Sequence, residues 1–164
     1  MTNMRRGFTM IELIFVIVII GILAAVAIPK LAANRDDAVA ATCQHEAGQF
    51  LSEITAFYTR NGSLAPLSNM TNIRVDASDT ENGFIADVDM NGTTAATYNC
   101  GGGAVAVFLP VATTNGGISN GPTFGITVTA GVPAADNLPA TISVSELAKN
   151  NFYKASPGYI LGGH

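Results

Sequence analysis

Apolar residues run almost without interruption from position 8 to position 28, and the exceptions are Thr9, Glu12 and Gly21. At 1.5 Å per residue this stretch forms about 30 Å of helix, which is the thickness of a bilayer hydrocarbon core. It is therefore predicted to span a membrane. Glu12 needs its own explanation, because an ionisable residue within such a segment is a sign of function.

After Pro29 the chain keeps a helical pattern, but apolar residues now occupy one face. They recur every three or four residues, the spacing of one side of an α-helix, at Val39, Cys43, Ala47, Phe50, Ile54 and Phe57. The tripeptide RNG at 60–62 provides a stop, because Asn and Gly adopt the left-handed conformation that ends helices. One helix over residues 9–60 is predicted, and its amphipathic half, residues 30–60, should pack on a globular head.

Residues 61–164 have the composition and alternation of a β-rich domain. The segments with strand-like character are FIADVDM (84–90), AVAVFLPV (104–111) and TFGITVTA (123–130), and turn-forming Gly, Asn and Pro separate them. An antiparallel sheet laid against the helix follows, so the predicted fold class is α+β. Near the end, SVSE at 143–146 fits a capping box before a short helix that ends near Tyr153. The tail SPGYILGGH at 156–164 is either an ordered surface segment or a mobile end.

Length and charge narrow the class of protein. A chain of 164 residues accommodates one compact domain beside a membrane segment. Its net charge of -4, with 12% charged residues, argues against nucleic-acid binding, which requires a basic patch. His45 lacks the second histidine of a helical zinc site, His164 stands alone, and CGGGA (100–104) lacks the lysine of a phosphate loop. Neither an enzyme nor a bound cofactor is expected.

The two cysteines, Cys43 and Cys100, form no CxxC pair of the kind found in metal ribbons and redox sites. Cys43 lies on the apolar helix face, so a bond to Cys100 would tie the helix to the sheet. Two interpretations stay open, namely a disulfide formed in an oxidising compartment and two buried free thiols.

The stretch DVDMNG matches the start of a calcium loop. Asp87, Asp89 and Asn91 occupy the first, third and fifth positions of that pattern, with Gly92 at its sharp turn. The twelfth position, however, is Tyr98 instead of a bidentate glutamate. The preferred alternative is a β-hairpin with a type I′ turn at Asn91 and Gly92.

The apolar stretch has three candidate roles. A cleaved secretory signal is supported by Arg5, Arg6 and the small residues AVA at 25–27. It is opposed by Glu12, by an apolar run longer than the usual ~7 to 15 residues, and by Pro29 close behind the cut. An ordinary membrane anchor accounts for the length but leaves Glu12 unexplained. The third role makes use of this carboxylate.

Gly7 followed by FTMIEL (8–13), an unbroken apolar helix and AAVAIPKL (24–31) resembles the N-terminus of type IV pilins and of type II secretion pseudopilins. The resemblance covers residues 5–35, about a fifth of the chain. Beyond about residue 60 no motif specific to a family is found. The resemblance implies a pilin-like fold.

The resemblance also implies how the N-terminus is processed. A prepilin peptidase would remove residues 1–7 as a leader by cutting between Gly7 and Phe8, and the new N-terminus at Phe8 would be methylated. Residues 8–29 would then span the membrane or the core of a filament. Glu12 would be the fifth residue of the mature protein.

Glu12 then gains a role in assembly. Each cut creates an ammonium group at Phe8, and parallel packing of the helices would bury this charge in an apolar bundle, where it needs a partner. The carboxylate of Glu12 from a neighbouring subunit can supply that partner. Gly21 and Pro29 are predicted to kink or loosen the helix, because proline removes one backbone hydrogen bond. Alternatively, Pro29 marks the exit from the membrane.

The resemblance implies a structural subunit of a type IV pilus-like filament, either a type IV pilin or a type II secretion pseudopilin. The implied partners are copies of the chain itself, prepilin peptidase, an inner-membrane platform protein, minor pilins or pseudopilins and, indirectly, an assembly ATPase. The protein would start in the bacterial inner membrane with a periplasmic head and end in a pseudopilus or a surface pilus. The alternative is a secreted or singly anchored β-rich binding domain without a role in assembly.

Overall fold

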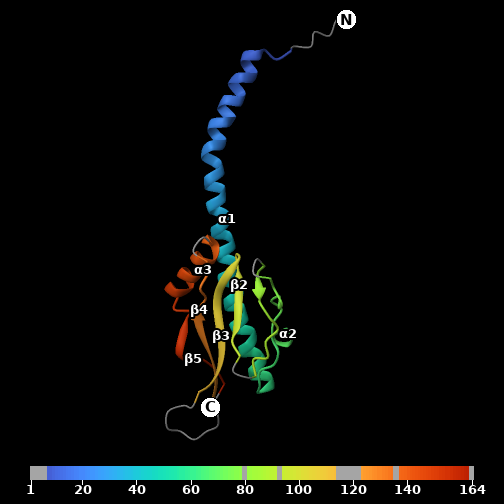
Figure 1. Ribbon diagram of the computed structural model, residues 1–164, viewed down its shortest axis with the longest axis vertical. Helices are drawn as coiled ribbons and strands as arrows, with labels where there is room; N and C mark the ends of the chain where they lie inside the picture. Colours follow the sequence, from blue (N-terminus) through green and yellow to red (C-terminus); the bar gives the residue numbers. More distant parts are fainter. Residues whose placement is uncertain (1–6, 79–80, 92–93, 114–122, 135–136, 163–164) are drawn as a thin grey trace, which may run out of the picture. The chain divides into compact units, whose positions relative to one another are not determined.

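The computed structural model describes residues 7–78, 81–91, 94–113, 123–134 and 137–162. The chain divides into two compact units, Met1–Asp36 and Asp37–His164. Helix α1, Met10–Asn61, contributes residues to both units. The predicted α+β fold, a long apolar helix followed by an antiparallel sheet domain, is confirmed (Figure 1).

In the first unit, α1 is apolar on every side from Leu13 to Pro29. Its most apolar window of 18 residues has a mean hydropathy of 3.1. The helix is therefore long and apolar enough to cross a membrane. The helix continues through Pro29 without a break, although this proline has no N–H to donate to the carbonyl of Ala25. The kink assigned to Gly21 and Pro29 stays a prediction.

The second unit begins with the amphipathic half of α1. The predicted stop at residues 60–62 is confirmed, because the helix ends at Asn61 and Gly62 has a φ of +72°. The Gly62 N–H donates to the carbonyl of Tyr58 at 2.7 Å, which satisfies one of the orphan carbonyls of the last turn.

A five-stranded antiparallel sheet forms the body of the head. Its strands are β1 (Gly83–Phe84), β2 (Ala96–Cys100), β3 (Gly103–Thr113), β4 (Thr123–Ala130) and β5 (Lys154–Gly162). They lie in the sheet in chain order, so each strand pairs with its neighbours along the chain. Two helices complete the head, α2 (Leu67–Met70) and α3 (Leu138–Lys149). Of the predicted strands, the second and third are confirmed as β3 and β4.

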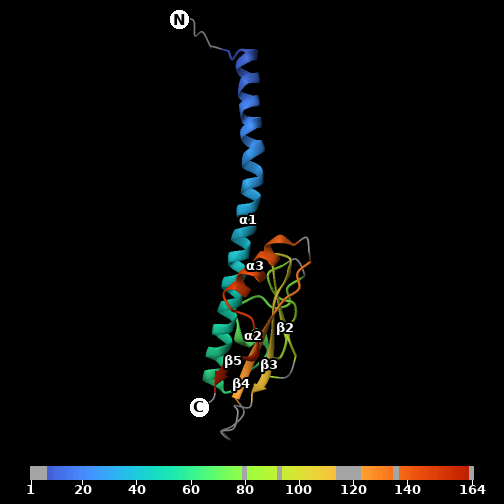
Figure 2. The same ribbon diagram turned by 90° about the vertical axis from the view of Figure 1, so that its left-hand side faces the viewer.

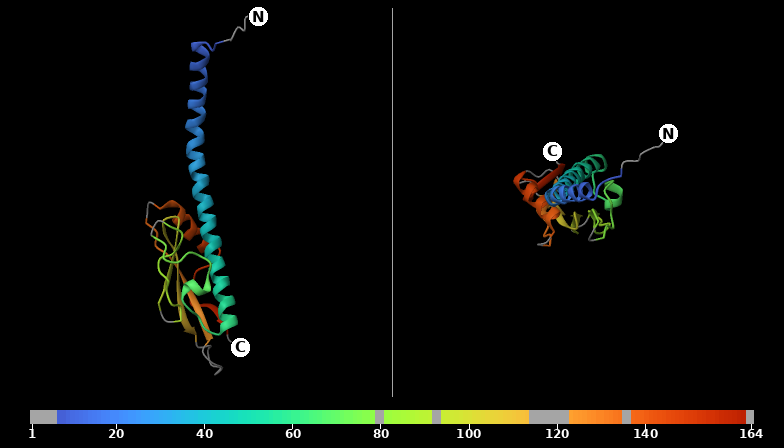
Figure 3. Two further views of the ribbon diagram at one scale, coloured as in Figure 1. Left: turned by 90° about the vertical axis from the view of Figure 1, so that its right-hand side faces the viewer. Right: turned by 90° about the horizontal axis from the view of Figure 1, so that it is seen from above.

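The core lies between α1 and one face of the sheet (Figures 2 and 3). The predicted helix stripe is confirmed, with Val39 and Phe57 partly buried and the four positions between them fully buried. Phe50 is central, because its ring centroid lies 4.5 Å from that of Phe84 and 4.7 Å from that of Phe108. Burial of these large aromatic side chains contributes to the stability of the head.

The prediction for the second short helix was wrong at both ends. Helix α3 begins after Asn137, whose side chain accepts a hydrogen bond from the Ala140 N–H, and it ends at Lys149 instead of near Tyr153. Ser143 is no N-cap but a buried residue inside α3, and its hydroxyl donates to the carbonyl oxygens of Pro139 (2.8 Å) and Ala40 (3.3 Å). A serine in this position tolerates the helix because its hydroxyl bonds backward along the chain.

The first predicted strand is shorter than expected. Only Gly83 and Phe84 pair with β2, because Phe84 enters the aromatic core whereas the next three side chains are all exposed and break the alternation. The predicted type I′ turn includes Gly92, which lies outside the described residues. Of the tail left open by the sequence, residues 156–162 form part of strand β5, and the last two residues lie outside the described ranges.

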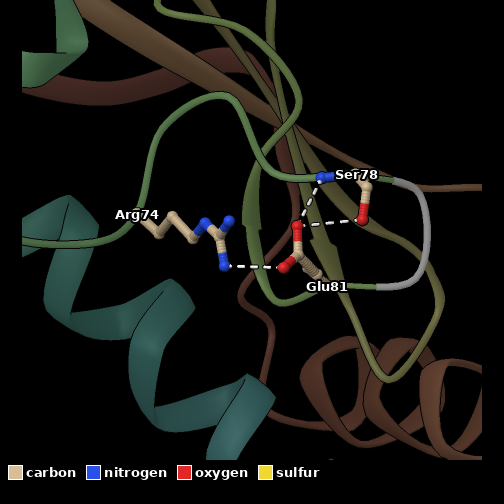
Figure 4. A network of polar contacts seen from close by, with 3 residues as sticks. All are labelled: Arg74, Ser78 and Glu81. Carbon is tan, nitrogen blue, oxygen red and sulfur yellow. Dashed lines mark hydrogen bonds and ion pairs between the residues drawn. The ribbon is translucent and has the colours of Figure 1, made fainter.

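The loop before β1 is closed by its own polar contacts (Figure 4). Glu81 accepts from the N–H (3.1 Å) and the hydroxyl (2.9 Å) of Ser78 and pairs with Arg74 at 2.7 Å. The hydrogen bonds from Ser78, together with the Arg74 guanidinium, hold the pKa of Glu81 below its usual value. Gly83 must be glycine, because a Cβ there would lie 2.5 Å from the Arg74 carbonyl oxygen. This closure fixes where Phe84 enters the core.

Candidate functional site

The N-terminal end of α1 is organised by Thr9 and Glu12. The Thr9 N–H donates to Oε2 of Glu12 at 2.8 Å, and the Thr9 hydroxyl donates to the same oxygen at 2.7 Å. In return the Glu12 N–H donates to Oγ1 of Thr9 at 3.3 Å. Because α1 begins at Met10, Thr9 is its N-cap and Glu12 is the third helical residue, so the pair forms a capping box.

This capping box was not predicted from the sequence. Its signal, a threonine followed three residues later by a glutamate ahead of an apolar run, is present in TMIE at 9–12. The structure therefore gives Glu12 a role inside its own chain. Among the described residues, Oε2 of Glu12 accepts both hydrogen bonds from Thr9, and Oε1 accepts none. One carboxylate oxygen thus stays available to another group.

The positions around Glu12 suit processing and packing. Gly7 and Phe8 precede the first helical turn, so the peptide bond between them lies in backbone without regular structure. Phe8 is 89% exposed, and large apolar side chains stay exposed on all sides of the helix as far as Leu31. A helix that is apolar all round is stable only in a membrane or inside a bundle. Residues 1–6 of the expected leader lie outside the described residues.

The two cysteines lie together inside the head. Cys43 of α1 and Cys100 of β2 form a disulfide with an S–S distance of 2.07 Å, which is one of the two interpretations left open by the sequence. One helical turn further along α1, Glu46 accepts a hydrogen bond from the hydroxyl of Tyr98. Burial, and then the contact with Glu46, raise the pKa of Tyr98. The helix and strand β2 are therefore joined by a covalent and a polar contact side by side.

The predicted calcium ligands make contacts with the backbone. Oδ1 of Asp87 accepts from the N–H of Ser68 at 2.9 Å, and this hydrogen bond lowers the pKa of Asp87. Oδ1 of Asp89 accepts from the N–H of Asn91 at 2.9 Å, the contact of a local turn. Within the described ranges, no group of three or more His, Cys, Asp or Glu side chains gathers around a point that could hold a metal ion. Calcium binding stays a prediction.

The remaining candidate, His45, lies on the exposed side of α1, as expected for a solvated helix residue. His164 lies outside the described residues. The structure thus brings the processing and assembly candidates Gly7, Phe8 and Glu12 together at one end of α1. It places the disulfide and the predicted calcium ligands Asp87 and Asp89 in the head.

The long apolar helix and the antiparallel sheet packed against its second half form a pilin-like α+β fold. Residues 2–28 match the family described as the prokaryotic N-terminal methylation motif. The chain therefore carries this methylation motif, and the resemblance to pilins and pseudopilins predicted from the sequence is confirmed by the relatives below.

Two kinds of relatives are similar to the chain. A type IV major pilin protein PilE1 of Neisseria gonorrhoeae is 32% identical over 103 residues, which are 62% of this chain and 57% of the relative. A type IV major pilin protein PilE from the same organism is 33% identical over 100 residues, 60% of this chain and 59% of the relative. The type II secretion system core protein G of Escherichia coli (strain K12) is 49% identical over 37 residues, 23% of this chain and 26% of the relative.

These similarities are distant and partial. The chain spans a little under three fifths of the length of the PilE relatives. No solved structure matches it. The expectation that the chain is not an enzyme stays a prediction.

Proposed function

We propose that this protein is a structural subunit of a type IV pilus-like filament, anchored in the bacterial inner membrane before it assembles. The observation that carries the proposal is the exposed apolar helix with a capping box at its start, directly after Gly7. In this proposal residues 1–7 are the leader and residues 8–29 form the segment that leaves the membrane for the filament core. Residues 30–60 connect it to the head, residues 61–164.

The cut between Gly7 and Phe8 creates the group that Glu12 is proposed to bind. Hydrolysis of this peptide bond leaves a carboxylate on Gly7 and an ammonium on Phe8. In water the ammonium is solvated, but among packed apolar helices it needs a counter-ion and hydrogen-bond acceptors. Glu12 of a neighbouring subunit offers Oε1, while its Oε2 stays in the capping box of its own helix. The carboxylate thus sets the alignment of adjacent helices.

The longer alignments favour a type IV pilin over a type II secretion pseudopilin. The PilE similarity covers 103 residues, far beyond the methylation motif, whereas the protein G similarity covers 37. The proposed partners are further copies of the chain, prepilin peptidase, an inner-membrane platform protein, minor subunits and, indirectly, an assembly ATPase.

The mature N-terminus tests this proposal most directly. In cells that contain a prepilin peptidase, we expect intact-mass and N-terminal sequencing of the membrane-bound protein to give a chain that starts at a methylated Phe8. Replacement of Gly7 by a large residue should block the cut and leave residues 1–7 in place. A mature chain that starts at Ile28 would instead support conventional secretion and remove the basis for a filament subunit.

The topology of the anchored protein is a second expectation. Arg5 and Arg6 precede the apolar segment, so the leader should stay in the cytoplasm and the head should reach the periplasm, although Lys30 and Arg35 on the other side weaken this charge bias. A C-terminal fusion to a reporter that is active only in the periplasm should therefore be active. Activity of a cytoplasm-only reporter at the same position would contradict this orientation.

A further inference from the structure

One loop of the head exposes large apolar side chains. The loop between β4 and α3, of which the structure describes residues 131–134 and 137, leads to Leu138 at the start of α3, and the side chains of Val132 and Leu138 are 89% and 53% exposed. Ile85 is the one other large apolar side chain in the described part of the head with comparable exposure. The sequence from 131 to 145 has a single charged residue, Asp136. An apolar pair in such a neutral stretch is a candidate interaction surface.

The loop is seated on the β2–β3 turn by three consecutive glycines. A Cβ at Gly101 would lie 2.8 Å from Cβ of Pro139, and one at Gly102 would lie 2.8 Å from Nδ2 of Asn137. Both glycines also have positive φ, +63° and +85°. A Cβ at Gly103 would lie 3.1 Å from Cβ of Pro133. The CGGGA stretch is therefore explained by this close approach, which holds Val132 and Leu138 outward.

This loop lies at the end of the head where the chain enters it. A Cβ at Gly101 would also lie 3.3 Å from Cγ1 of Val39, and the Ser143 hydroxyl of α3 reaches the carbonyl of Ala40. Figure 1 shows α3 and the β2–β3 turn at the same end of the sheet. Val39 follows Leu31, the last large residue of the exposed apolar segment, by eight positions, which measure about 12 Å as helix and at most about 28 Å when extended.

We propose that Val132 and Leu138 insert into the lipid surface while the protein is anchored in the membrane, so that these two side chains form a second, reversible membrane contact. The proposal rests on the membrane anchoring in the proposed function. Two apolar side chains would bind a bilayer weakly by themselves, because the gain is proportional to the buried area. The membrane anchor strengthens this weak binding, since a short tether holds the loop at a high effective concentration beside the bilayer.

Tryptophan fluorescence tests the contact, because the natural chain has no tryptophan. The full chain with Val132→Trp is reconstituted into vesicles in which part of the lipid is brominated, and bromine quenches an indole that lies within the bilayer. The matched control is Ser63→Trp, an exposed site just after the end of α1. Asn61 is 21 residues beyond Ala40, about 32 Å along the helix.

We expect brominated lipid to quench the indole at position 132 more than the indole at position 63, by about twofold or more. Adding Leu138→Ser to the Val132→Trp chain should reduce that quenching, because half of the apolar pair is removed. Equal quenching at the two positions would overturn the proposal. A blue-shifted emission at position 132 that brominated lipid leaves unchanged would also overturn it, and would show contact with a second copy of the chain.

This test is independent of filament assembly. Sedimentation with the vesicles shows whether the chain is anchored, and the quenching shows whether the loop touches lipid. A chain that is anchored and enters filaments but shows no difference in quenching contradicts the loop contact alone. A chain that does not remain with the vesicles contradicts the anchoring on which both proposals rest.

Discussion

Replacement of Glu12 by valine is expected to keep the protein in the membrane but to remove it from filaments. The variant lacks an ionisable group in the apolar segment, so insertion should be at least as efficient as for the natural chain. Cleavage after Gly7 should persist, because the glycine and the bond to Phe8 are unchanged. The ammonium at Phe8 would then enter the bundle without a partner, and filament yield should fall by about tenfold or more, since an uncompensated buried charge is strongly destabilising.

The capping box allows a sharper version of this experiment. Glutamine can replace glutamate in a capping box, so Glu12→Gln keeps the contact with Thr9 while it removes the charge. We therefore expect Glu12→Gln to resemble valine in filament yield, and Glu12→Asp to be intermediate because its carboxylate reaches less far. The measurement is the fraction of each variant in sheared fibres, normalised to processed protein in the membrane. Normal yields of both the valine and glutamine variants would rule out the pairing mechanism.

Loss of the disulfide is expected to cause a large loss of stability in the head. The bond between Cys43 and Cys100 closes a loop with a sequence separation of 57. In the chain-entropy description, such a loop stabilises the folded state by about 4 kcal/mol through its effect on the unfolded chain. Addition of reductant should therefore lower the denaturant midpoint of the purified full-length protein in detergent.

The control for this measurement is the double variant Cys43→Ala/Cys100→Ala. It already lacks the cross-link, so its midpoint should be low and should not move when reductant is added. Alkylation of the denatured natural protein should modify no cysteine before reduction and two afterwards. Two modified cysteines in the unreduced sample would show that the bond does not form.

The parts of the fold that depend on local pattern could be predicted from the sequence. The one-sided apolar stripe and the glycine after it determine where α1 packs and where it ends, and both are properties of neighbouring residues. Strands β3 and β4 are also long enough to show their own alternation. The N-terminal motif is equally local, so the sequence alone predicts processing at Gly7 and a role of Glu12 in assembly.

The parts that depend on distant residues could not be predicted. Ser143 has the local signature of a helix start, but it lies inside α3, where its hydroxyl reaches the carbonyl of Ala40, a residue 103 positions away. Strand β5 exists because β4 offers it a pairing edge, which the sequence of the tail does not reveal. The three glycines of the β2–β3 turn make sense only when the loop before α3 is seen against them.

The position of the disulfide has a mechanical consequence. Cys43 is near the point where α1 enters the head, ahead of the buried residues Phe50 and Ile54. A tensile force applied to the chain before Cys43 is therefore carried into strand β2 through a covalent bond. The covalent route therefore acts beside the non-covalent packing of α1 against the sheet, so helix and sheet stay joined even where that packing loosens. In the proposed filament, tension on the N-terminal part of α1 would thus reach each head through a sulfur bridge as well as through side-chain contacts.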